Sequence, residues 1–308
     1  MLVGLLVLGL FLGSPLAVQS QDTRGATQRI TPKVLVIGID GVRPDVLETA
    51  NTPNIDALAR EGFFTDRAQT GFPTVSGPGW SSFLNGVWPA KHGVTDNSFE
   101  GARYQQHPDF LTRLEQLDPS LNTFAVANWT PLFQSPPEAP LIGLAVDDRH
   151  ILDGSVGGWS ETDEVATGLA VQAIQTDQPD ALFVYLGNPD ETSHHNGDIG
   201  PLYREAIEVA DSHVGRLVEA VRGRATAEAE NWLILISTDH GRTEAGGHGG
   251  PSPEEKTIFF LAHGPEMTQA ESADPVHIVD VAVTALAHMG VALDPAWGLD
   301  GRIAGLAR

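Results

Sequence analysis

Residues 33–41 read KVLVIGIDG, an unbroken apolar, β-branched run that ends in an aspartate and a glycine. A run without polar alternation is typical of a strand buried on both faces of a mostly parallel sheet. In open α/β sheets, ligands bind beyond the carboxyl ends of the strands, which is where Asp40 stands. The stretch therefore predicts a fold class and one edge of a candidate site. Asp-Gly pairs are also common in ordinary turns, so Asp40 needs support from elsewhere in the chain.

The rest of the chain continues this alternation of strands and helices. Further apolar runs predict strands at 123–127, 181–186, 232–237 and 257–262. Helical spacing of apolar residues, or a capped start, predicts helices at 55–61, 202–222 and 278–289, with a shorter one at 81–84. Such alternation predicts an α/β protein, a three-layer sandwich with helices on both faces of a mostly parallel central sheet.

The 308 residues, 41% of them hydrophobic, are enough for one large α/β domain with an ample core. We expect that domain at 33–308. Within it, residues 98–160 are rich in Pro, Trp, Gly and Asp and are expected to hold loops or a small cap over the site. Four aromatic residues there could stack on a base or belong to the core: Phe99, Tyr104, Trp129 and Phe133.

The first residues differ in composition from the remainder. Residues 2–16 are almost wholly apolar and are followed by small residues up to Ser20, which predicts a signal peptide over 1–20. Residues 21–32 are polar and predict a flexible leader. The expected protein is exported, either periplasmic or secreted, without stable membrane insertion; a membrane anchor is the alternative for the apolar segment.

Charge and cysteine content exclude several classes of function. A net charge of −22 repels nucleic acid and anionic membranes, so polynucleotide binding is not expected. The chain has no cysteine, which excludes disulfides, thiolate metal sites and a cysteine nucleophile. A bound metal ion would therefore need histidine and carboxylate ligands.

Three more fragments supply such ligands at strand ends or in glycine-rich turns. Asp239 and His240 follow the strand at 232–237, and Asp190 precedes His194 by four residues, which places both on one face of a helical turn. His248 lies within Gly-Gly-His-Gly-Gly. With Asp40, these residues could hold two divalent metal ions, an arrangement suited to breaking phosphate esters.

The absence of cysteine leaves a hydroxyl group as the nucleophile. Residues 72–80 read FPTVSGPGW and predict a loop that enters a helix. A hydroxyl at a helix start lies among backbone N–H groups and in a dipole that favours an anionic phosphoryl group. Ser76 and Thr74 both satisfy this requirement, and either could instead be a helix cap.

Taken in order, these fragments resemble the alkaline phosphatase superfamily, and most closely its nucleotide pyrophosphatase/phosphodiesterase branch. The resemblance covers roughly residues 33–303. Its motifs are VLVIGIDGVRPD (34–45), TPNIDALAREG (52–62), FPTVSGPGWSSFLNGVWPAKHGVTDN (72–97), NPDETSHHNG (188–197), STDHG (237–241) and GGHGGPSPEEKTIFFLAHGP (246–265).

The resemblance implies an alkaline phosphatase-like fold and a site with two zinc ions, although other divalent metals could serve. One ion would be held by Asp40, Asp239, His240 and Ser76, and the other by Asp190, His194 and His248. Ser76 would be the nucleophile that forms a covalent phosphoryl intermediate, and Asn97 would bind a phosphate oxygen. The implied substrate is a small phosphate ester or nucleotide, cleaved at a phosphodiester or pyrophosphate bond.

Two positions depart from the family pattern. The branch usually has Thr where Ser76 stands and Asn where Gly79 stands. A phosphomonoesterase is the nearest alternative activity. A sulfatase is disfavoured because Trp80 replaces the arginine of its Ser-x-Pro-x-Arg motif. A non-catalytic, exported metal-binding protein is the alternative of a different class, and His263, His277 and His288 are the alternatives to His248.

Overall fold

A mixed sheet forms the centre of the molecule in the computed structural model, which describes residues 1–4, 30–267 and 274–306. In the described chain the sheet has seven strands in the order β2-β7-β6-β1-β5-β3-β4. Their bounds are β1 Thr31–Ile39, β2 Phe63–Gln69, β3 Thr123–Ala127, β4 Asp148–Ile151, β5 Ala181–Leu186, β6 Glu230–Ser237 and β7 Thr257–His263.

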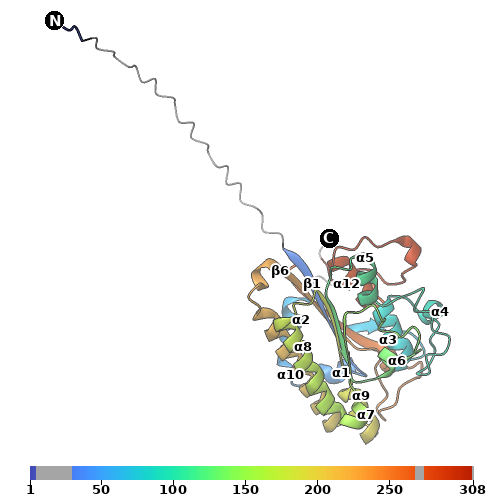
Figure 1. Cartoon of the computed structure of the whole chain (residues 1–308). Coiled ribbons are helices and arrows are strands. Elements are labelled where there is room, and N and C mark those ends of the chain that lie inside the picture. Colours follow the sequence, from blue (N-terminus) through green and yellow to red (C-terminus); the bar gives the residue numbers. More distant parts are fainter. Residues whose placement is uncertain (5–29, 268–273, 307–308) are drawn as a thin grey trace.

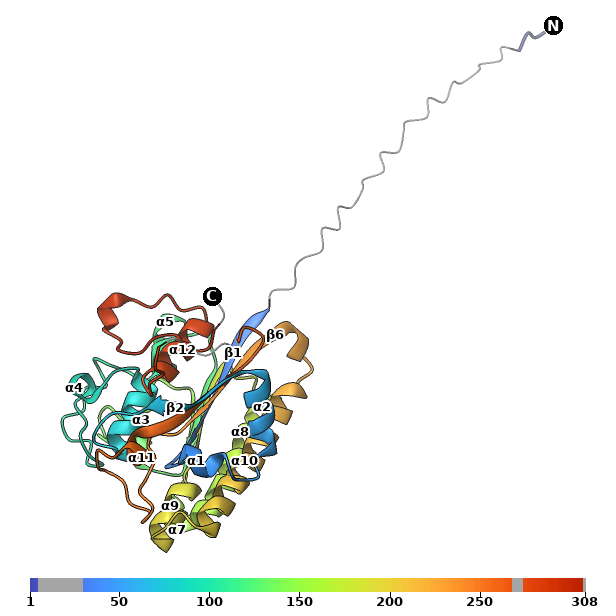
Figure 2. The same ribbon diagram turned by 180° about the vertical axis from the view of Figure 1, so that it is seen from behind.

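The middle of the sheet is parallel, as predicted. β1 pairs in parallel with both β5 and β6, and β3 pairs in parallel with β5 and β4. β7 runs antiparallel to its neighbours β6 and β2. Seen from behind, β2 lies beyond β1 and β6 toward one edge of the sheet (Figure 2). Because β1, β5 and β6 run parallel, their carboxyl ends lie at the same end of the sheet.

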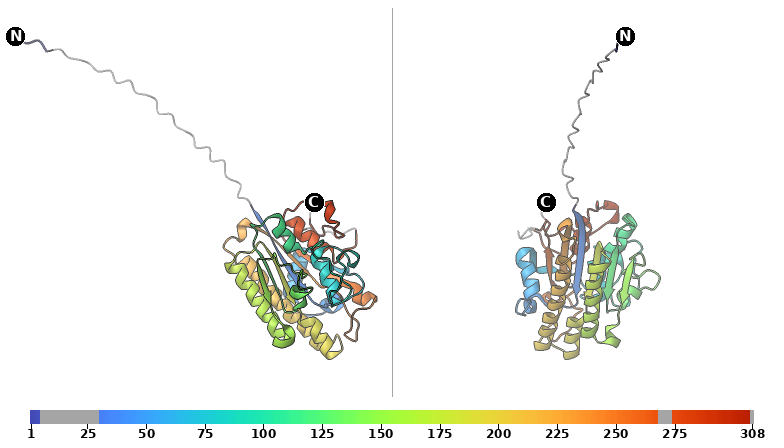
Figure 3. Two further views of the ribbon diagram at one scale, coloured as in Figure 1. Left: turned by 45° about the vertical axis from the view of Figure 1, so that its right-hand side comes forward. Right: turned by 60° about the vertical axis from the view of Figure 1, so that its left-hand side comes forward.

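Helices cover both faces of the sheet and make a three-layer sandwich, as predicted (Figure 1 and Figure 3). One face packs against α1 Pro44–Leu47, α2 Pro53–Glu61, α8 Trp159–Thr176 and α10 Pro201–Arg222. The other packs against α3 Ser76–Asn85, α5 Phe110–Leu117, α6 Pro131–Gln134 and α12 Asp280–His288. The remaining helices are α4 Pro89–His92, α7 Gly154–Gly157, α9 Asn188–Asn196 and α11 Pro253–Lys256, with short 3₁₀ turns at Ala227–Ala229 and Pro295–Trp297.

The buried strands and the helices α2, α10 and α12 lie where the sequence predicts them, within a few residues. The helix predicted at 81–84 is longer than expected, because α3 begins at Ser76 and includes part of the predicted loop. β1 begins at Thr31, so the end of the predicted leader belongs to the sheet. Two edge strands, β2 and β4, are additional, and α8 is an additional long helix. Most of the predicted signal peptide and leader, residues 5–29, falls outside the described residues. Among the described residues, no helix is both long and apolar enough to cross a membrane.

Residues 98–160 contain more regular structure than a loop region would. They include α5, β3, α6, β4 and α7, and both strands belong to the central sheet. Phe99, Tyr104 and Phe133 are buried in the core, and Trp129 packs against it. These four aromatic residues therefore serve packing, which was one of the two roles expected for them.

Candidate functional site

The candidate residues come together at the end of the sheet where the carboxyl ends of β1, β5 and β6 lie. Asp40 directly follows β1, and its N–H donates to the carbonyl oxygen of Leu186 at the end of β5 (2.9 Å). Asp239 and His240 follow β6, and α9 follows β5 after one intervening residue. The parallel register of these three strands aligns their ends, because each pair of neighbours is hydrogen-bonded along its length.

Asp40 is buried and only half satisfied. Its Oδ2 accepts hydrogen bonds from Trp80 Nε1 (2.9 Å) and from the Tyr185 hydroxyl (2.7 Å). Its Oδ1 has no hydrogen-bond partner. Burial, and then the charge of Asp190, raises the pKa of Asp40 to about 7. A buried carboxylate oxygen without a partner is costly unless a cation compensates it.

Asp239 repeats this pattern. Its Oδ1 accepts the N–H of Gly41 at 3.1 Å, while its Oδ2 has no partner. Burial, together with the charges of Asp40 and Asp190, raises the pKa of Asp239 well above its usual range. Asp40 and Asp239 thus present two unsatisfied oxygens to the same small space, together with His240. The residues present fit a divalent cation at this point.

His240 is oriented for ligation by its own backbone environment. Its Nδ1 lies 2.9 Å from the carbonyl oxygen of Gly241, which assigns the proton to Nδ1. Nε2 then offers its lone pair, 3.2 Å from Asp239 Oδ2 and 3.6 Å from Asp40 Oδ1. Burial lowers the pKa of His240 well below its usual range, so the ring stays neutral. A ligating histidine whose other nitrogen donates to a carbonyl is the usual arrangement at metal sites.

The structure separates the two hydroxyls that the sequence left as alternatives. Ser76 is the first residue of α3, and its Oγ lies 3.3 Å from His240 Nε2. Thr74 Oγ1 instead donates to the carbonyl of Gly250 (2.8 Å) and accepts the N–H of Gly249 (2.9 Å). Thr74 therefore holds the glycine-rich loop, whereas Ser76 lies beside His240, next to the carboxylates of Asp40 and Asp239.

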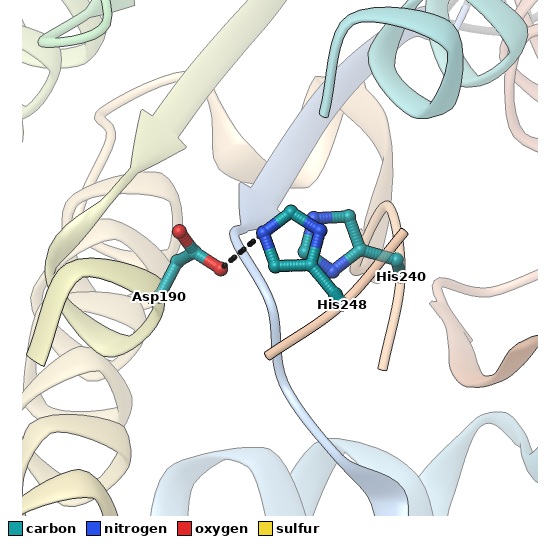
Figure 4. A group of neighbouring side chains, drawn as sticks. All are labelled: Asp190, His240 and His248. Carbon is teal, nitrogen blue, oxygen red and sulfur yellow. Dashed lines mark ion pairs between the residues drawn. The ribbon is translucent and has the colours of Figure 1, made fainter. Parts of the chain in front are cut away.

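A second group of side chains lies beside the first. Asp190 and His194 occupy one face of α9, with 3.2 Å between Asp190 Oδ2 and His194 Nε2. His248 Nε2 lies 2.8 Å from His194 Nε2 and 3.8 Å from Asp190 Oδ1. Figure 4 shows the Asp190 carboxylate directed at the His248 ring, which stacks on His240 with 3.8 Å between ring centroids. The neighbouring His195 is exposed.

Hydrogen bonds and charges prepare this second group for a cation. The Nδ1 of His248 lies 2.8 Å from the carbonyl oxygen of Thr74, which leaves Nε2 free to ligate. Burial lowers the pKa of His248. Burial also disfavours ionisation of Asp190, but the hydrogen bond with His194 and the charge of Arg242 outweigh it and lower its pKa. Two ring nitrogens only 2.8 Å apart need a shared proton or a cation between or beside them.

Asn97 approaches the start of α3. Its Oδ1 accepts the Gly77 N–H at 2.7 Å, so this backbone donor is already engaged by Asn97. The Nδ2 group of Asn97 keeps its donors, because the oxygen side of the amide faces Gly77. The three alternative histidines lie elsewhere. His263 is in β7, His277 packs its ring on Trp88, and His288 Nε2 lies near the carbonyl oxygens of Lys33 and Asn231, at the amino ends of β1 and β6.

Several residues build the site although the sequence did not predict that role for them. Trp80 and Tyr185 hold Asp40, and Gly38 makes room for Trp80, because a Cβ there would lie 2.4 Å from the indole ring. Arg242 is fully buried and bonds to Asp190. The only sequence signal for Arg242 is its position directly after the Asp-His-Gly fragment. Its burial, which the structure shows, requires a charged or hydrogen-bonding partner.

The comparisons with known proteins agree with the motifs. A sequence model of the type I phosphodiesterase/nucleotide pyrophosphatase family matches residues 34–249. The Homo sapiens ectonucleotide pyrophosphatase/phosphodiesterase family member 7 is 26% identical over 252 residues, which are 75% of this chain and 51% of that protein. The Bos taurus bis(5'-adenosyl)-triphosphatase is 24% identical over 237 residues, 69% of this chain and 48% of that protein. The chain thus spans about half the length of these curated relatives.

Solved structures share the fold. A 2-O GAG sulfatase superposes with a TM-score of 0.71 and 15% identity, covering 89% of this chain and 73% of that one. The murine ectonucleotide pyrophosphatase/phosphodiesterase 5, solved as an inactive variant in complex with AMP, superposes with a TM-score of 0.65 and 14% identity. That superposition covers 86% of this chain and 96% of the other. At these identities the likeness establishes the alkaline phosphatase-like fold and nothing about substrate.

Proposed function

The chain belongs to the type I phosphodiesterase/nucleotide pyrophosphatase family, and from this premise we propose that it hydrolyses phosphodiester or nucleotide pyrophosphate bonds at Ser76. One observation carries the proposal. The Ser76 hydroxyl, at the start of α3, lies 3.3 Å from His240 Nε2, beside a cluster of buried carboxylates with unpartnered oxygens. A hydroxyl needs an activating group of this kind to act as a nucleophile.

The donor set fits two divalent cations. Asp40, Asp239, His240 and Ser76 would hold one, and Asp190, His194 and His248 the other. Zinc suits a set of histidine and carboxylate ligands in a protein without cysteine, although other divalent ions accept the same donors. When bound, the pair of cations would lower the pKa of the serine hydroxyl and offset negative charge on the leaving oxygen.

The chain's own residues would then carry the reaction in two displacements. Ser76 Oγ loses its proton to solvent and forms a bond to phosphorus while the bond to the leaving oxygen breaks, and that oxygen takes up a proton. A water molecule then bonds through its oxygen to phosphorus as the Oγ–phosphorus bond breaks, and one of its protons restores the Ser76 hydroxyl. Asn97 Nδ2 would donate to a non-bridging phosphate oxygen, since Asn97 Oδ1 is held by the Gly77 N–H.

The positions of the basic side chains favour a diester or pyrophosphate over a monoester. A monoester carries an additional negative charge and needs a further cationic donor. Arg43 bonds to Asp45 and to the Arg242 carbonyl oxygen, and Lys91 bonds to Asp300 and the Gly298 carbonyl oxygen. Arg242 is fully buried. All three cations are thus bonded to groups other than Ser76, although Arg242 itself belongs to the site. The AMP bound by the murine relative makes nucleotides the substrates to test first.

We place this activity in a single catalytic domain, 33–308, that acts outside the cytoplasm on small phosphate esters. A net charge of −22 argues against polynucleotide substrates. The predicted signal peptide is the basis for export, and the ectoenzyme relative from Homo sapiens supports it. The test is N-terminal sequencing of the protein recovered from the exported fraction of cells that express the full chain.

The test of the activity compares substrates and variants in samples of measured metal content. We expect the wild type to cleave bis-p-nitrophenyl phosphate faster than p-nitrophenyl phosphate. Ser76→Ala should lower kcat/KM on the diester by about 10³-fold or more. Ser212→Ala, in an exposed residue of α10, is the matched control and should leave the rate unchanged.

Three outcomes would contradict the proposal. Full activity in Ser76→Ala would exclude this nucleophile. Full metal occupancy and activity in Asp40→Ala would exclude the ligand assignment. A metal-loaded wild type inert toward monoester, diester and nucleotide substrates would make the chain a non-catalytic metal-binding protein.

A further inference from the structure

Arg242 is a fully buried cation at the junction of the three segments that build the site. Its Nε donates to the carbonyl oxygen of Gly41 (3.0 Å) and its Nη1 to that of Gly246 (2.9 Å). Its Nη2 donates to Asp190 Oδ1. The guanidinium thus joins the turn after β1, the glycine-rich loop and α9, and none of its bonds reaches solvent.

The surroundings of Arg242 are shaped to receive it. Gly41 has a φ of +65°, and a Cβ there would lie 2.4 Å from both Arg242 Nη2 and Asp190 Oδ1. Tyr203 packs beside the guanidinium, with 5.4 Å from Cζ to the ring centroid. The Tyr203 hydroxyl also donates to the Gly41 carbonyl oxygen at 2.7 Å. A side chain other than glycine at position 41 would displace either the arginine or the aspartate.

Arg242 makes the charges of the two candidate cation sites unequal. The first site combines two carboxylates, Asp40 and Asp239, with a neutral histidine. The second has one carboxylate, Asp190, and that carboxylate is already paired with Arg242. The permanent positive charge of a buried guanidinium both repels a neighbouring cation and occupies one oxygen of its ligand. Asp190 keeps its Oδ2, on the His194 side, for a cation.

We propose that Arg242 is a positioning residue that holds Asp190 and makes the second site the weaker and more readily exchanged of two. This inference rests on the proposed function for the assignment of the two ligand groups. Tight occupancy is expected at Asp40–Asp239–His240. The site at Asp190–His194–His248 should release its ion first, since the number of uncompensated ligand charges sets the affinity for a divalent cation.

Calorimetric titration of the metal-free protein with Zn²⁺ measures this directly. The wild type should show two binding events whose dissociation constants differ by at least about tenfold. Asp190→Asn should abolish the weaker event and leave the tighter one. Arg242→Met removes the charge and keeps an unbranched stem, so the weaker event should tighten by about tenfold or more, because the repulsion between the guanidinium and the bound cation is lost.

Two further variants separate charge from packing. Arg242→Lys keeps the charge without the planar fork, so the second site should stay weak while the melting temperature falls. Arg216→Met is the control, because Arg216 lies on α10 and pairs with Glu164, and it should change neither affinity. Two equal affinities in the wild type would overturn the inference, and that measurement needs no variant to fold.

Unchanged metal affinities in a folded Arg242→Met protein would also overturn it and would leave Arg242 a structural role only. Because the titration does not require turnover, its outcome is independent of catalysis. An inactive protein whose two sites have unequal affinities for Zn²⁺ would contradict the proposed function and support this inference. An active protein with two equal sites would do the reverse.

Discussion

At the scale of single residues, α3 approaches the candidate ligand Asp239 closely at Gly79. A Cβ at Gly79 would lie 3.0 Å from Asp239 Cβ and 3.1 Å from the Asp239 carbonyl oxygen. The Cβ and carbonyl oxygen of Asp239 are fixed by the backbone, so they cannot move aside as easily as the end of a flexible side chain. Any larger residue at position 79 would therefore have to displace Asp239 or α3 by a few tenths of an ångström.

We predict that Gly79→Ala lowers kcat/KM on the diester by about tenfold or more, because it displaces a candidate ligand. Gly168→Ala is the matched control, since Gly168 also lies in a helix and has nothing within 4 Å of an added Cβ. That control should stabilise the protein by about 0.5–1 kcal/mol and leave the rate unchanged. The paired measurements are steady-state kinetics and thermal melts. Wild-type kinetics in Gly79→Ala would show that Asp239 can move without loss.

At the scale of elements, the start of β6 is fastened by a buried ion pair. Arg224 Nε and Nη2 donate to the two oxygens of Glu230 at 2.7 and 2.8 Å, and Trp232 Nε1 donates to the same carboxylate at 2.8 Å. Burial disfavours the ionised form of Glu230, but the bonds from Arg224 and Trp232 outweigh it and lower its pKa to about 2. An unfolded glutamate has a pKa of about 4.3, so the ionised group stabilises the folded state.

Glu230→Gln should therefore destabilise the protein in a pH-dependent way. The depressed pKa of Glu230 gives a contribution that is fully present above the unfolded pKa and is lost as the pH falls through the folded value of about 2. The variant should melt about 2–6 °C lower at pH 7 and at pH 5, with a smaller difference near pH 3. Glu228→Gln, in an exposed neighbour, should have little effect at any pH. A difference that grows toward low pH would contradict this assignment.

The strands that the sequence predicts correctly are those that are buried on both faces of the sheet. β1, β3, β5, β6 and β7 are strongly apolar, and their positions are confirmed. β2 (FFTDRAQ) and β4 (DRHI) are polar edge strands, so their apolar pattern is too weak to predict them. α8 was missed because alanines such as Ala166, Ala170 and Ala173 make much of its buried face. Small residues give little hydrophobic periodicity, although they pack closely against a neighbouring helix.

The candidate site follows the same division. Residues directly after strands could be placed from the sequence, since parallel strands end at one edge; Asp40 and Asp239 are examples. The partners Trp80 and Tyr185 could not, because they reach Asp40 from α3 and β5 through tertiary packing. Arg242 adjoins the Asp-His-Gly fragment, but its pairing with Asp190 of α9 is a tertiary contact that the sequence does not show. The choice between Thr74 and Ser76 likewise required knowing which of the two hydroxyls forms hydrogen bonds with the glycine-rich loop.

At the scale of the whole molecule, the site joins elements that carry separate parts of the core. Its carboxylates come from the ends of β1 and β6 and from α9, and the sheet between them is packed on both faces. In a chain of net charge −22, buried carboxylates close to one another oppose folding unless cations offset them. Divalent ions bound there would hold these elements together, so metal content should control the stability of the entire domain.

We therefore predict that complete removal of divalent ions with a chelator lowers the melting temperature by about 3–8 °C. Ligands that bind only the folded state add about 2.7 kcal/mol at a free concentration one hundred times their dissociation constant. Restoring Zn²⁺ should recover the loss in Ser76→Ala as well as in the wild type, because six of the proposed ligands are carboxylates and histidines that this variant keeps across the two sites. Scanning calorimetry on samples of measured metal content tests this. An unchanged melting temperature after the ions are gone would show that the carboxylate cluster is stable without them.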